Sequence, residues 1–255
     1  MNERLDRALV RRGLARSRSH AQAMINSGQI VVDGSIVRRA GEQVAASAAI
    51  DAPDDRYVSR GAHKLIGALN DLELSVAGRA LDAGASTGGF TEVLLARGCQ
   101  EVFAVDVGSA QLAPALRADP RVRLRERTNL RDLRLDDVGG SPVDLVVADV
   151  SFISLRLLVG PLVSVTRDDG WLLMLVKPQF EVGRELLGKG GVVRQPAHQA
   201  QAVSGVINAA EEYGWRGVAA VPSQLPGVSG NREFFVLFRR TESAPKLDLQ
   251  ALAET

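Results

Sequence analysis

The stretch that decides the fold is Leu81-Asp82-Ala83-Gly84-Ala85-Ser86-Thr87-Gly88-Gly89-Phe90-Thr91. The apolar residues 80–83 are typical of the end of a buried strand, and residues 90–96 have the pattern of a helix. Glycine, which occurs three times between them, lets the backbone approach a ligand closely. A strand, a glycine-rich turn and a helix N-terminus form the nucleotide-binding corner of a doubly wound α/β sheet.

The spacing of these glycines favours S-adenosylmethionine (SAM) over a dinucleotide. The dinucleotide fingerprint G-x-G-x-x-G lacks its second glycine here, because Ser86 stands in that place. Asp82 suits a cationic ligand such as SAM, which carries a sulfonium and an ammonium group. The next strand, 101–105, ends at Asp106, which is placed to accept hydrogen bonds from ribose hydroxyls. We therefore predict SAM as the cofactor; the alternative is a glycine-rich turn that binds no ligand.

Composition limits the class of protein. The chain has 255 residues, of which 45% are hydrophobic, enough for one large domain or for a medium and a small one. It contains no run of 18 apolar residues and begins without the apolar core of a secretory signal, so we expect no membrane contact. Cys99 is the single cysteine, which suits the reducing cytoplasm. We predict a cytoplasmic protein, with a monomer as the default oligomeric state.

Residues 1–52 form a basic segment that we predict to be a first domain. Up to Arg39 it contains eight arginines and three acidic residues, a net charge of +5 in a chain whose total is +1. The guanidinium group of arginine binds phosphate through two hydrogen bonds and stacks on bases. Two short helices and a hairpin with an Asp33-Gly34 turn are expected here. The candidate RNA-binding residues are Arg4, Arg7, Arg11, Arg12, Arg16 and Arg18.

This first segment resembles the small α+β RNA-binding fold first described in small-subunit ribosomal protein four. The resemblance lies in Arg4-Leu5-Asp6, Ser17-Arg18-Ser19 and Ile30-Val31-Val32-Asp33-Gly34. It implies a surface of arginines presented to structured RNA. The alternative is a solvent-exposed basic face that binds no RNA.

The rest of the chain alternates between strand and helix patterns. We expect a linker at 53–61, a second domain at 62–240 and a polar tail at 241–255. Strands are predicted at 79–83, 101–105, 122–124, 143–148, 171–176, 218–221 and 234–238, and helices at 89–96, 110–116, 155–165 and 197–213. This order predicts a Rossmann-like α/β domain with a seven-stranded, mostly parallel sheet that ends in an antiparallel hairpin. Such an ending is usual in SAM-dependent methyltransferases.

Polar residues at the ends of these strands are the candidate site residues, because ligands bind at the carboxyl ends of parallel strands. Asp149 and Lys177 each follow a strand, and Glu233 precedes the last one. Lys64 lies in the first turn of a helix, which is a poor place for a cation. The candidate cofactor-binding residues are Asp82, Gly84, Ser86, Gly88, Phe90, Asp106, Asn129, Leu130 and Asp149. The alternatives are structural ion pairs, a solvent-facing Lys64 and an Asn129 that caps a turn.

Residues 179–195 contain a near match to the phosphate-binding G-x-x-x-x-G-K-[ST] motif. The match fails at Gly190, which has no hydroxyl for magnesium. We predict no metal site, and instead a mobile loop over the site. Arg184, Lys189 and Arg194 of this loop are candidates for RNA phosphate contacts or are solvated charges.

Several segments together resemble the TlyA family over almost the whole chain. They are residues 59–65, 82–91, 148–155, 176–181 and 188–193. The resemblance implies a SAM-dependent 2′-O-methyltransferase that acts on cytidine in ribosomal RNA or ribosomal subunits, and many members are called haemolysins. It also implies an FtsJ-like methyltransferase domain whose Lys-Asp-Lys-Glu tetrad falls on Lys64, Asp149, Lys177 and Glu233.

The chemistry of ribose methylation suits these residues. A ribose hydroxyl must lose its proton as it attacks a methyl group, and a lysine can accept that proton only in its neutral form. Burial and a second nearby ammonium favour the neutral form. Our hypothesis makes Lys177 the base and Lys64 the neighbouring cation that orients the ribose. Asp149 and Glu233 would hold the lysines and substrate in line.

Three other functions compete with this hypothesis. One is an RNA-binding assembly factor that keeps SAM without turnover. A second is a pore-forming haemolysin, which the lack of a long apolar or basic amphipathic segment disfavours. A third is a methyltransferase for a protein or a small molecule, which the arginine-rich first segment disfavours.

Overall fold

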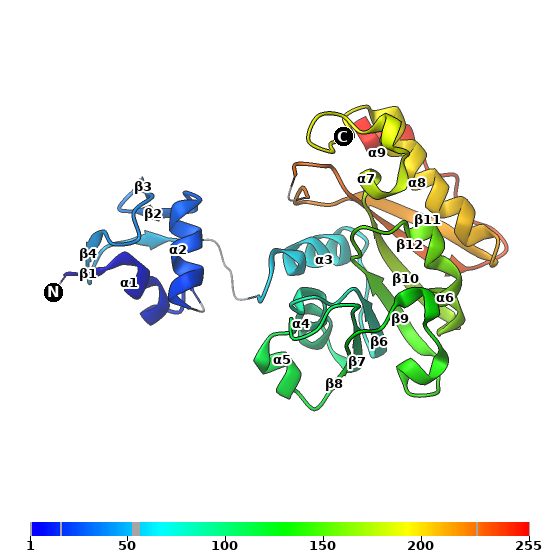
Figure 1. The fold of residues 1–255 in the computed structure, drawn as a ribbon, viewed down its shortest axis with the longest axis horizontal. Coiled ribbons are helices and arrows are strands. Elements are labelled where there is room, and N and C mark those ends of the chain that lie inside the picture. The colour runs from blue at the N-terminus through cyan, green and yellow to red at the C-terminus, as the bar shows by residue number, and fades with distance from the viewer. Residues whose placement is uncertain (1, 16, 53–56, 228, 255) are drawn as a thin grey trace. The chain divides into compact units, whose positions relative to one another are not determined.

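The chain folds into two compact units, Met1–Val58 and Ser59–Thr255 (Figure 1). The computed structural model describes residues 2–15, 17–52, 57–227 and 229–254. Each unit has its own hydrophobic core. The division falls inside the segment predicted as a linker, of which residues 53–56 lie outside the described residues.

The first unit has the α+β architecture that the sequence predicts. Its elements are β1 (Asn2–Arg4), α1 (Leu5–Arg11), α2 (Arg18–Asn26), β2 (Ile30–Val32), β3 (Ser35–Val37), β4 (Gln43–Ala45) and β5 (Ile50–Asp51). β1 pairs with β4, and β2 lies between β3 and β5, with every pair antiparallel. Asp33 and Gly34 both have positive φ angles, 47° and 82°, as a two-residue hairpin turn requires.

The helices of the first unit are fixed by capping and by burial. Ser17 caps α2, because its side chain accepts a hydrogen bond from the His20 backbone N–H at 3.2 Å. Leu5, Leu9 and Ile25 are fully buried between the helices and the sheets. Burial of such side chains stabilises a small unit by roughly 1.5–3 kcal/mol each.

The second unit is built on a seven-stranded sheet, as predicted. The strands are β6 (Gly78–Ala83), β7 (Cys99–Val105), β8 (Val122–Arg125), β9 (Val143–Ala148), β10 (Thr166–Val176), β11 (Trp215–Pro222) and β12 (Phe234–Arg240). Their spatial order is β11-β12-β10-β9-β6-β7-β8. β12 runs antiparallel to both of its neighbours, and the other pairs are parallel. The predicted terminal hairpin is therefore confirmed.

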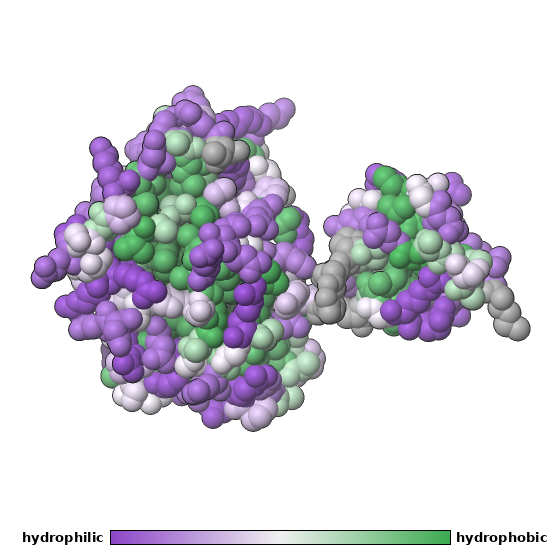
Figure 2. Space-filling model, turned by 180° about the vertical axis from the view of Figure 1, so that it is seen from behind, coloured by the Kyte–Doolittle hydropathy of each residue, from purple (hydrophilic) through white to green (hydrophobic). Residues whose placement is uncertain are grey.

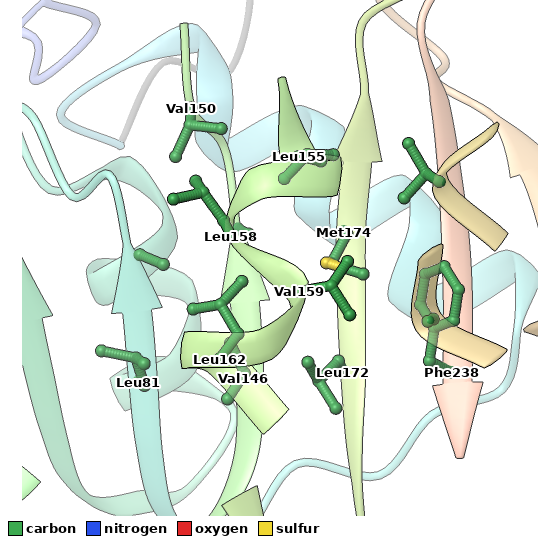
Figure 3. Close-up of a cluster of buried hydrophobic side chains, with 14 of the residues drawn as sticks. Leu81, Val146, Val150, Leu155, Leu158, Val159, Leu162, Leu172, Met174 and Phe238 are labelled. Atoms are coloured by element: carbon green, nitrogen blue, oxygen red, sulfur yellow. The ribbon is translucent and has the colours of Figure 1, made fainter. Parts of the chain in front are cut away.

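Helices cover both faces of this sheet (Figure 1). They are α3 (Arg60–Asp71), α4 (Gly89–Ala96), α5 (Pro114–Ala118), α6 (Val159–Ser164), α7 (Pro178–Glu181), α8 (Pro196–Glu211) and α9 (Leu249–Glu254), with short 3-10 turns at Leu130–Asp132, Leu135–Val138, Leu155–Leu157 and Arg184–Leu186. α3 packs beside α4. On the other face, Leu158, Val159 and Leu162 pack against strand residues such as Val146 and Leu172 (Figure 3).

Several segments differ from their predicted form. The helix expected at 155–165 is a 3-10 turn at Leu155–Leu157 followed by α6. The helix expected at 110–116 begins only at Pro114, because Ala110 has a positive φ angle of 58° and proline favours the first helical turn. The polar tail expected after Thr241 instead contains α9. Ala253 of α9 is buried, and Leu249 and Leu252 pack against the core. The spacing of these apolar residues is that of one helix face.

The turn after β6 requires glycine at two positions. Gly84 has a φ angle of +89°, and a Cβ there would lie 2.6 Å from the backbone oxygen of Asp149. Gly88 has a φ angle of +100°, and a Cβ there would lie 2.3 Å from a methyl group of Leu116. The turn therefore fits closely between β9 and α5, which fixes the start of α4.

Figure 2 shows both hydrophilic and hydrophobic side chains on the drawn face of each unit, with hydrophobic ones gathered toward the middle of the larger unit. No helix in the described ranges combines the length and the hydrophobicity needed to cross a membrane.

Candidate active site

Strand register brings the tetrad together at one edge of the sheet. Val176, the last residue of β10, pairs with Phe234, the first residue of β12, so Lys177 and Glu233 lie side by side. Asp149 follows the neighbouring parallel strand β9. Lys64 comes from α3, and a Cβ on Gly61 of the same helix would lie 3.6 Å from an Asp149 carboxylate oxygen. All four tetrad side chains line one cavity of about 820 Å³.

The tetrad forms two ion pairs. Lys64 Nζ lies 2.6 Å from Glu233 Oε2, and the two side chains are 11% and 2% exposed. Lys177 Nζ lies 2.6 Å from Asp149 Oδ1, and it also donates a hydrogen bond to Ser151 Oγ at 2.9 Å. Removing one partner of such a pair leaves an uncompensated buried charge. The sequence predicts these four residues as a group, and the structure adds which lysine pairs with which acid.

A second cavity of about 610 Å³ adjoins the first. Six of the predicted cofactor-binding residues line it, namely Gly84, Ser86, Asp106, Asn129, Leu130 and Asp149. Asp149, Ser151 and Phe152 line both cavities, so the two spaces meet at the end of β9. A small molecule in the second cavity would therefore lie next to the tetrad.

Asp106 and Asn129 are held in place by the backbone. The Asp106 carboxylate accepts hydrogen bonds from the backbone N–H groups of Ser86 at 2.8 Å and Gly108 at 2.6 Å. Asn129 caps a 3-10 turn by accepting a hydrogen bond from the Arg131 N–H. The two interpretations of Asn129 are therefore compatible, since it caps a turn and also lines the cavity.

Three predicted cofactor-binding residues lie behind the cavity wall instead of on it. Asp82 is fully buried and accepts a hydrogen bond from Thr91 Oγ1 at 2.6 Å. Phe90 stacks on Phe235 with ring centroids 6.1 Å apart. Gly88 packs against Leu116. None of the three lines the second cavity, so direct contact with a cofactor stays a prediction for them.

The sequence matches the family model described as FtsJ-like methyltransferase over residues 57–240, and that of the S4 domain over residues 3–50. The chain is 49% identical to the 16S/23S rRNA (cytidine-2′-O)-methyltransferase TlyA of Mycobacterium tuberculosis (strain ATCC 25618 / H37Rv), over 98% of this chain and 94% of the relative. The chain belongs to the TlyA family of FtsJ-like methyltransferases. The predicted resemblance to this family is thereby confirmed.

Two further matches cover nearly the whole chain. The chain is 33% identical to Hemolysin A of Brachyspira hyodysenteriae, over 92% of this chain and 99% of the relative. A solved structure from Streptococcus thermophilus, described as a candidate hemolysin, matches with a TM-score of 0.77 at 35% identity and covers 99% of this chain and 94% of that chain. The TlyA-family fold therefore extends over both units.

The S4 domain of this TlyA-family chain does not present all of its predicted arginines freely. Arg4 and Arg18 pair with the buried Asp6 at 3.0 and 3.1 Å, so the pKa of Asp6 is held well below its usual range. Arg11 pairs with Glu3. Arg12 donates hydrogen bonds to the backbone oxygens of Ala45, Ala46 and Ala48, and Arg7 is exposed. Arg16 lies outside the described residues.

Several residues of the tetrad cavity were not predicted as site residues. Ser151, Phe152, Phe180 and Asn231 all line it, together with Gln179 from the predicted loop. Asn231 accepts a hydrogen bond from the Val193 N–H at 2.9 Å and donates one to the Gly191 oxygen at 3.0 Å. Its position two residues before Glu233 is the one sequence signal that could have found it. Asn231 therefore ties the loop at 188–193 to the start of β12.

Within the part of the chain that the structure describes, no group of three or more His, Cys, Asp or Glu side chains is placed to hold a metal ion. The carboxylates nearest the second cavity are those of Asp82, at the end of β6, and of Asp106 and Asp149, which directly follow β7 and β9.

Asp82 makes stability depend on pH. Burial raises its pKa to about 7, and the negative charges of Asp149 and Asp106 act in the same direction. In the unfolded chain an aspartate has a pKa of about 3.9. The stability that protonated Asp82 contributes is therefore fully present below about pH 4 and is lost as the pH rises to about 7.

We expect Asp82→Asn to remove this loss. In urea unfolding without cofactor between pH 4 and 8, the stability of the variant relative to wild type should rise with pH by up to about 4 kcal/mol. The difference should become constant above about pH 7. A difference that does not change with pH would contradict the assignment.

Proposed function

We propose that this protein transfers a methyl group from SAM to the 2′-oxygen of a cytidine ribose in ribosomal RNA. The observation that carries the proposal is the pairing of two lysines with two carboxylates in one cavity, directly beside a second, ligand-sized cavity. The name of the Mycobacterium tuberculosis relative and the S4 domain support RNA as the substrate. We propose ribosomal subunits as the form in which the RNA is recognised.

The second cavity suits SAM. Asp82, Asp106 and Asp149 place three carboxylates in or behind its wall, and Asp82 Oδ1 is buried without a hydrogen-bond partner. A ligand with positive charges would relieve the repulsion among these carboxylates. When bound, SAM supplies a methyl group on a positively charged sulfur. Asp106 would accept hydrogen bonds from the cofactor ribose, and Gly84 would let the ligand approach the backbone.

Lys177 is the proposed proton acceptor. Asp149 and Ser151, which line both cavities, hold its Nζ in the first cavity, next to the junction of the two. With Nζ as the neutral amine, a substrate hydroxyl at this junction would pass its proton to it, while the hydroxyl oxygen takes the methyl group and the sulfonium sulfur leaves as a neutral thioether. Positioning the hydroxyl and the amine contributes more to the rate than the proton transfer itself, because the two groups no longer have to meet by diffusion.

Lys64 and Glu233 form the other wall of the cavity. Their ion pair is more deeply buried than that of Lys177 and Asp149. The positive charge of Lys64 would orient the ribose. Glu233 keeps Lys64 in place. We thus assign proton transfer to the Lys177–Asp149 pair and orientation of the ribose to the Lys64–Glu233 pair.

Phe152 is placed to hold the target base. It is 91% exposed, has a left-handed φ angle of 66°, and lies 5.4 Å from Phe180 between ring centroids. A non-glycine residue adopts that backbone conformation at a cost, which is typical of functional positions. An exposed aromatic ring at the junction of both cavities suits stacking on an unstacked base.

We expect Phe152→Ala to lower kcat/KM for ribosomal subunits by about 5- to 150-fold, the equivalent of the roughly 1–3 kcal/mol that one stacked base contributes. Phe152→Tyr keeps the ring and should remain within about threefold of wild type. Thermal unfolding should change little, because the side chain is exposed. Equal rates for Phe152→Ala and wild type would remove the base-stacking role.

Incubation with a labelled methyl donor tests the proposed function. Purified small and large ribosomal subunits that lack the modification should incorporate label that ribonuclease releases and protease does not. Label released by protease would indicate a protein methyltransferase. Binding of subunits and SAM without incorporation would indicate the non-catalytic assembly factor.

A further inference from the structure

Glu181 is a buried acid outside the tetrad. It is the last residue of α7, the short helix that begins directly after Lys177 at the end of β10. Its side chain is 2% exposed, yet it does not line the tetrad cavity. No step of the proposed reaction uses it.

Glu181 connects two loops of the active site. Its Oε2 accepts a hydrogen bond from Ser154 Oγ at 2.6 Å, and its Oε1 accepts one from the Leu155 N–H at 2.7 Å. Arg156 adds an ion pair at 3.5 Å and donates a hydrogen bond to the Glu181 backbone oxygen at 3.1 Å. The carboxylate of α7 thus binds the far end of the loop that follows β9.

The same two loops meet at two other points. Residues 149–154, here called the β9 loop, carry Asp149, Ser151 and Phe152. Residues 177–183, here called the β10 loop, carry Lys177 and Phe180. Lys177 pairs with Asp149 and Ser151, and Phe180 packs on Phe152. The Glu181 contacts are the third connection, and the one that is buried away from substrate.

We propose that Glu181 is a positioning residue that sets the β9 loop against the β10 loop, and so fixes the distance between the Lys177 amine and the bound nucleotide. This inference rests on the proposed function. With the third connection in place, neither loop can slide along the other without breaking hydrogen bonds to a buried carboxylate, which cost more to lose than exposed ones.

The energetic cost of this arrangement supports a role in positioning. Burial raises the pKa of Glu181 above its ordinary value, while the hydrogen bonds from Ser154 and Leu155 act against this. An apolar side chain of similar size would hold two loops together without burying a charge. A carboxylate instead provides two hydrogen-bond acceptors in fixed directions. Such a group fixes the relative position of the two loops more than it stabilises the fold.

Two Glu181 variants and one control test the inference. Glu181→Leu keeps the size of the side chain and removes both acceptors. Glu181→Gln keeps a carbonyl oxygen for the Leu155 N–H and loses the charge beside Arg156. The control is Asp144→Asn at the opposite end of β9, where Asp144 accepts a hydrogen bond from the Arg79 N–H at 2.8 Å. It removes a strand-connecting carboxylate remote from the tetrad.

We expect kcat for methyl transfer to subunits to fall by about 10- to 100-fold in Glu181→Leu, at a temperature where circular dichroism shows every variant folded. Glu181→Gln should lie between Glu181→Leu and wild type. The Kd for SAM, measured by calorimetry, should stay within about threefold of the wild-type value, because Glu181 does not line the second cavity, where we propose that SAM binds. Asp144→Asn should lose stability and keep the wild-type kcat.

Three outcomes overturn the inference: a wild-type kcat in Glu181→Leu, an equal loss of kcat in Asp144→Asn, or a parallel loss of SAM affinity. If Glu181→Leu does not fold, Ser154→Ala decides, since it removes one hydrogen bond at 2.6 Å. A threefold or greater loss of kcat supports the proposal, and a wild-type kcat overturns it. Absence of turnover in the wild-type protein would instead refute the proposed function, and this inference with it.

Discussion

Replacing Lys177 with alanine is expected to lower kcat for methyl transfer by about 10²- to 10⁴-fold, the range that general base catalysis contributes. The physical reason is that the amine lies next to the junction of the two cavities, held by Asp149 at 2.6 Å and Ser151 at 2.9 Å. Single-turnover transfer of labelled methyl groups to ribosomal subunits measures this loss.

The chain offers a matched control for this variant. It contains four lysines, at positions 64, 177, 189 and 246, and Lys246 is exposed outside both cavities. Lys246→Ala should keep the wild-type rate. The Kd of Lys177→Ala for SAM should stay near the wild-type value, because Lys177 does not line the second cavity. Wild-type turnover in Lys177→Ala would remove this residue from the role of base.

Replacing Lys64 with methionine is expected to destabilise the protein by about 3–5 kcal/mol, because Glu233 would then be a buried carboxylate without its partner. The double variant Lys64→Met/Glu233→Leu replaces both charges by apolar groups of similar size. It should recover most of this loss and still be inactive. Urea unfolding and methyl transfer, measured on the same preparations, separate the two effects.

A surface ion pair serves as the comparison for Lys64. Arg240 and Asp168 pair with side chains that are 53% and 77% exposed. Arg240→Ala should change stability by no more than about 1 kcal/mol. If Lys64→Met costs no more than Arg240→Ala, the buried pair does not hold the cavity as described. If the double variant is active, Lys64 has no role in the reaction.

The alternation of apolar strands and helix patterns was enough to predict the sheet of the second unit. Central strands such as β9 and β10 are buried on both faces, so they stand out as continuous apolar runs. Short elements were harder to predict. α5 starts late because Ala110 adopts a left-handed conformation, and α9 gains its stability only from packing on the core.

The four tetrad residues could be found because polar residues stand out beside apolar strands, and because the motifs resemble a known family. The pairing could not be predicted from local pattern, since Lys64 and Glu233 are 169 positions apart. Glu181 was missed for a related reason. Its burial depends on Ser154 and Leu155 from another loop, and nothing in its own segment signals that contact.

In the first unit, the number of arginines likewise did not predict which of them form ion pairs. The excess of arginines is visible in the sequence, but the partners are not. Asp6 is one of three acidic residues before Arg39, and in the fold it is buried and takes both Arg4 and Arg18. The sequence therefore predicts a basic surface without showing which guanidinium groups keep donors free for phosphate.

The position of the methyl group on the product decides whether the cytidine ribose is the acceptor and Lys177 the base. Ribosomal subunits are incubated with the protein and SAM carrying a deuterated methyl group, and the RNA is digested to nucleosides for mass spectrometry, with Lys177→Ala as the blank. We expect deuterated 2′-O-methylcytidine in the wild-type reaction and not in the blank. A deuterated methyl group on a base, or labelled 2′-O-methylcytidine formed equally by Lys177→Ala, would contradict this expectation.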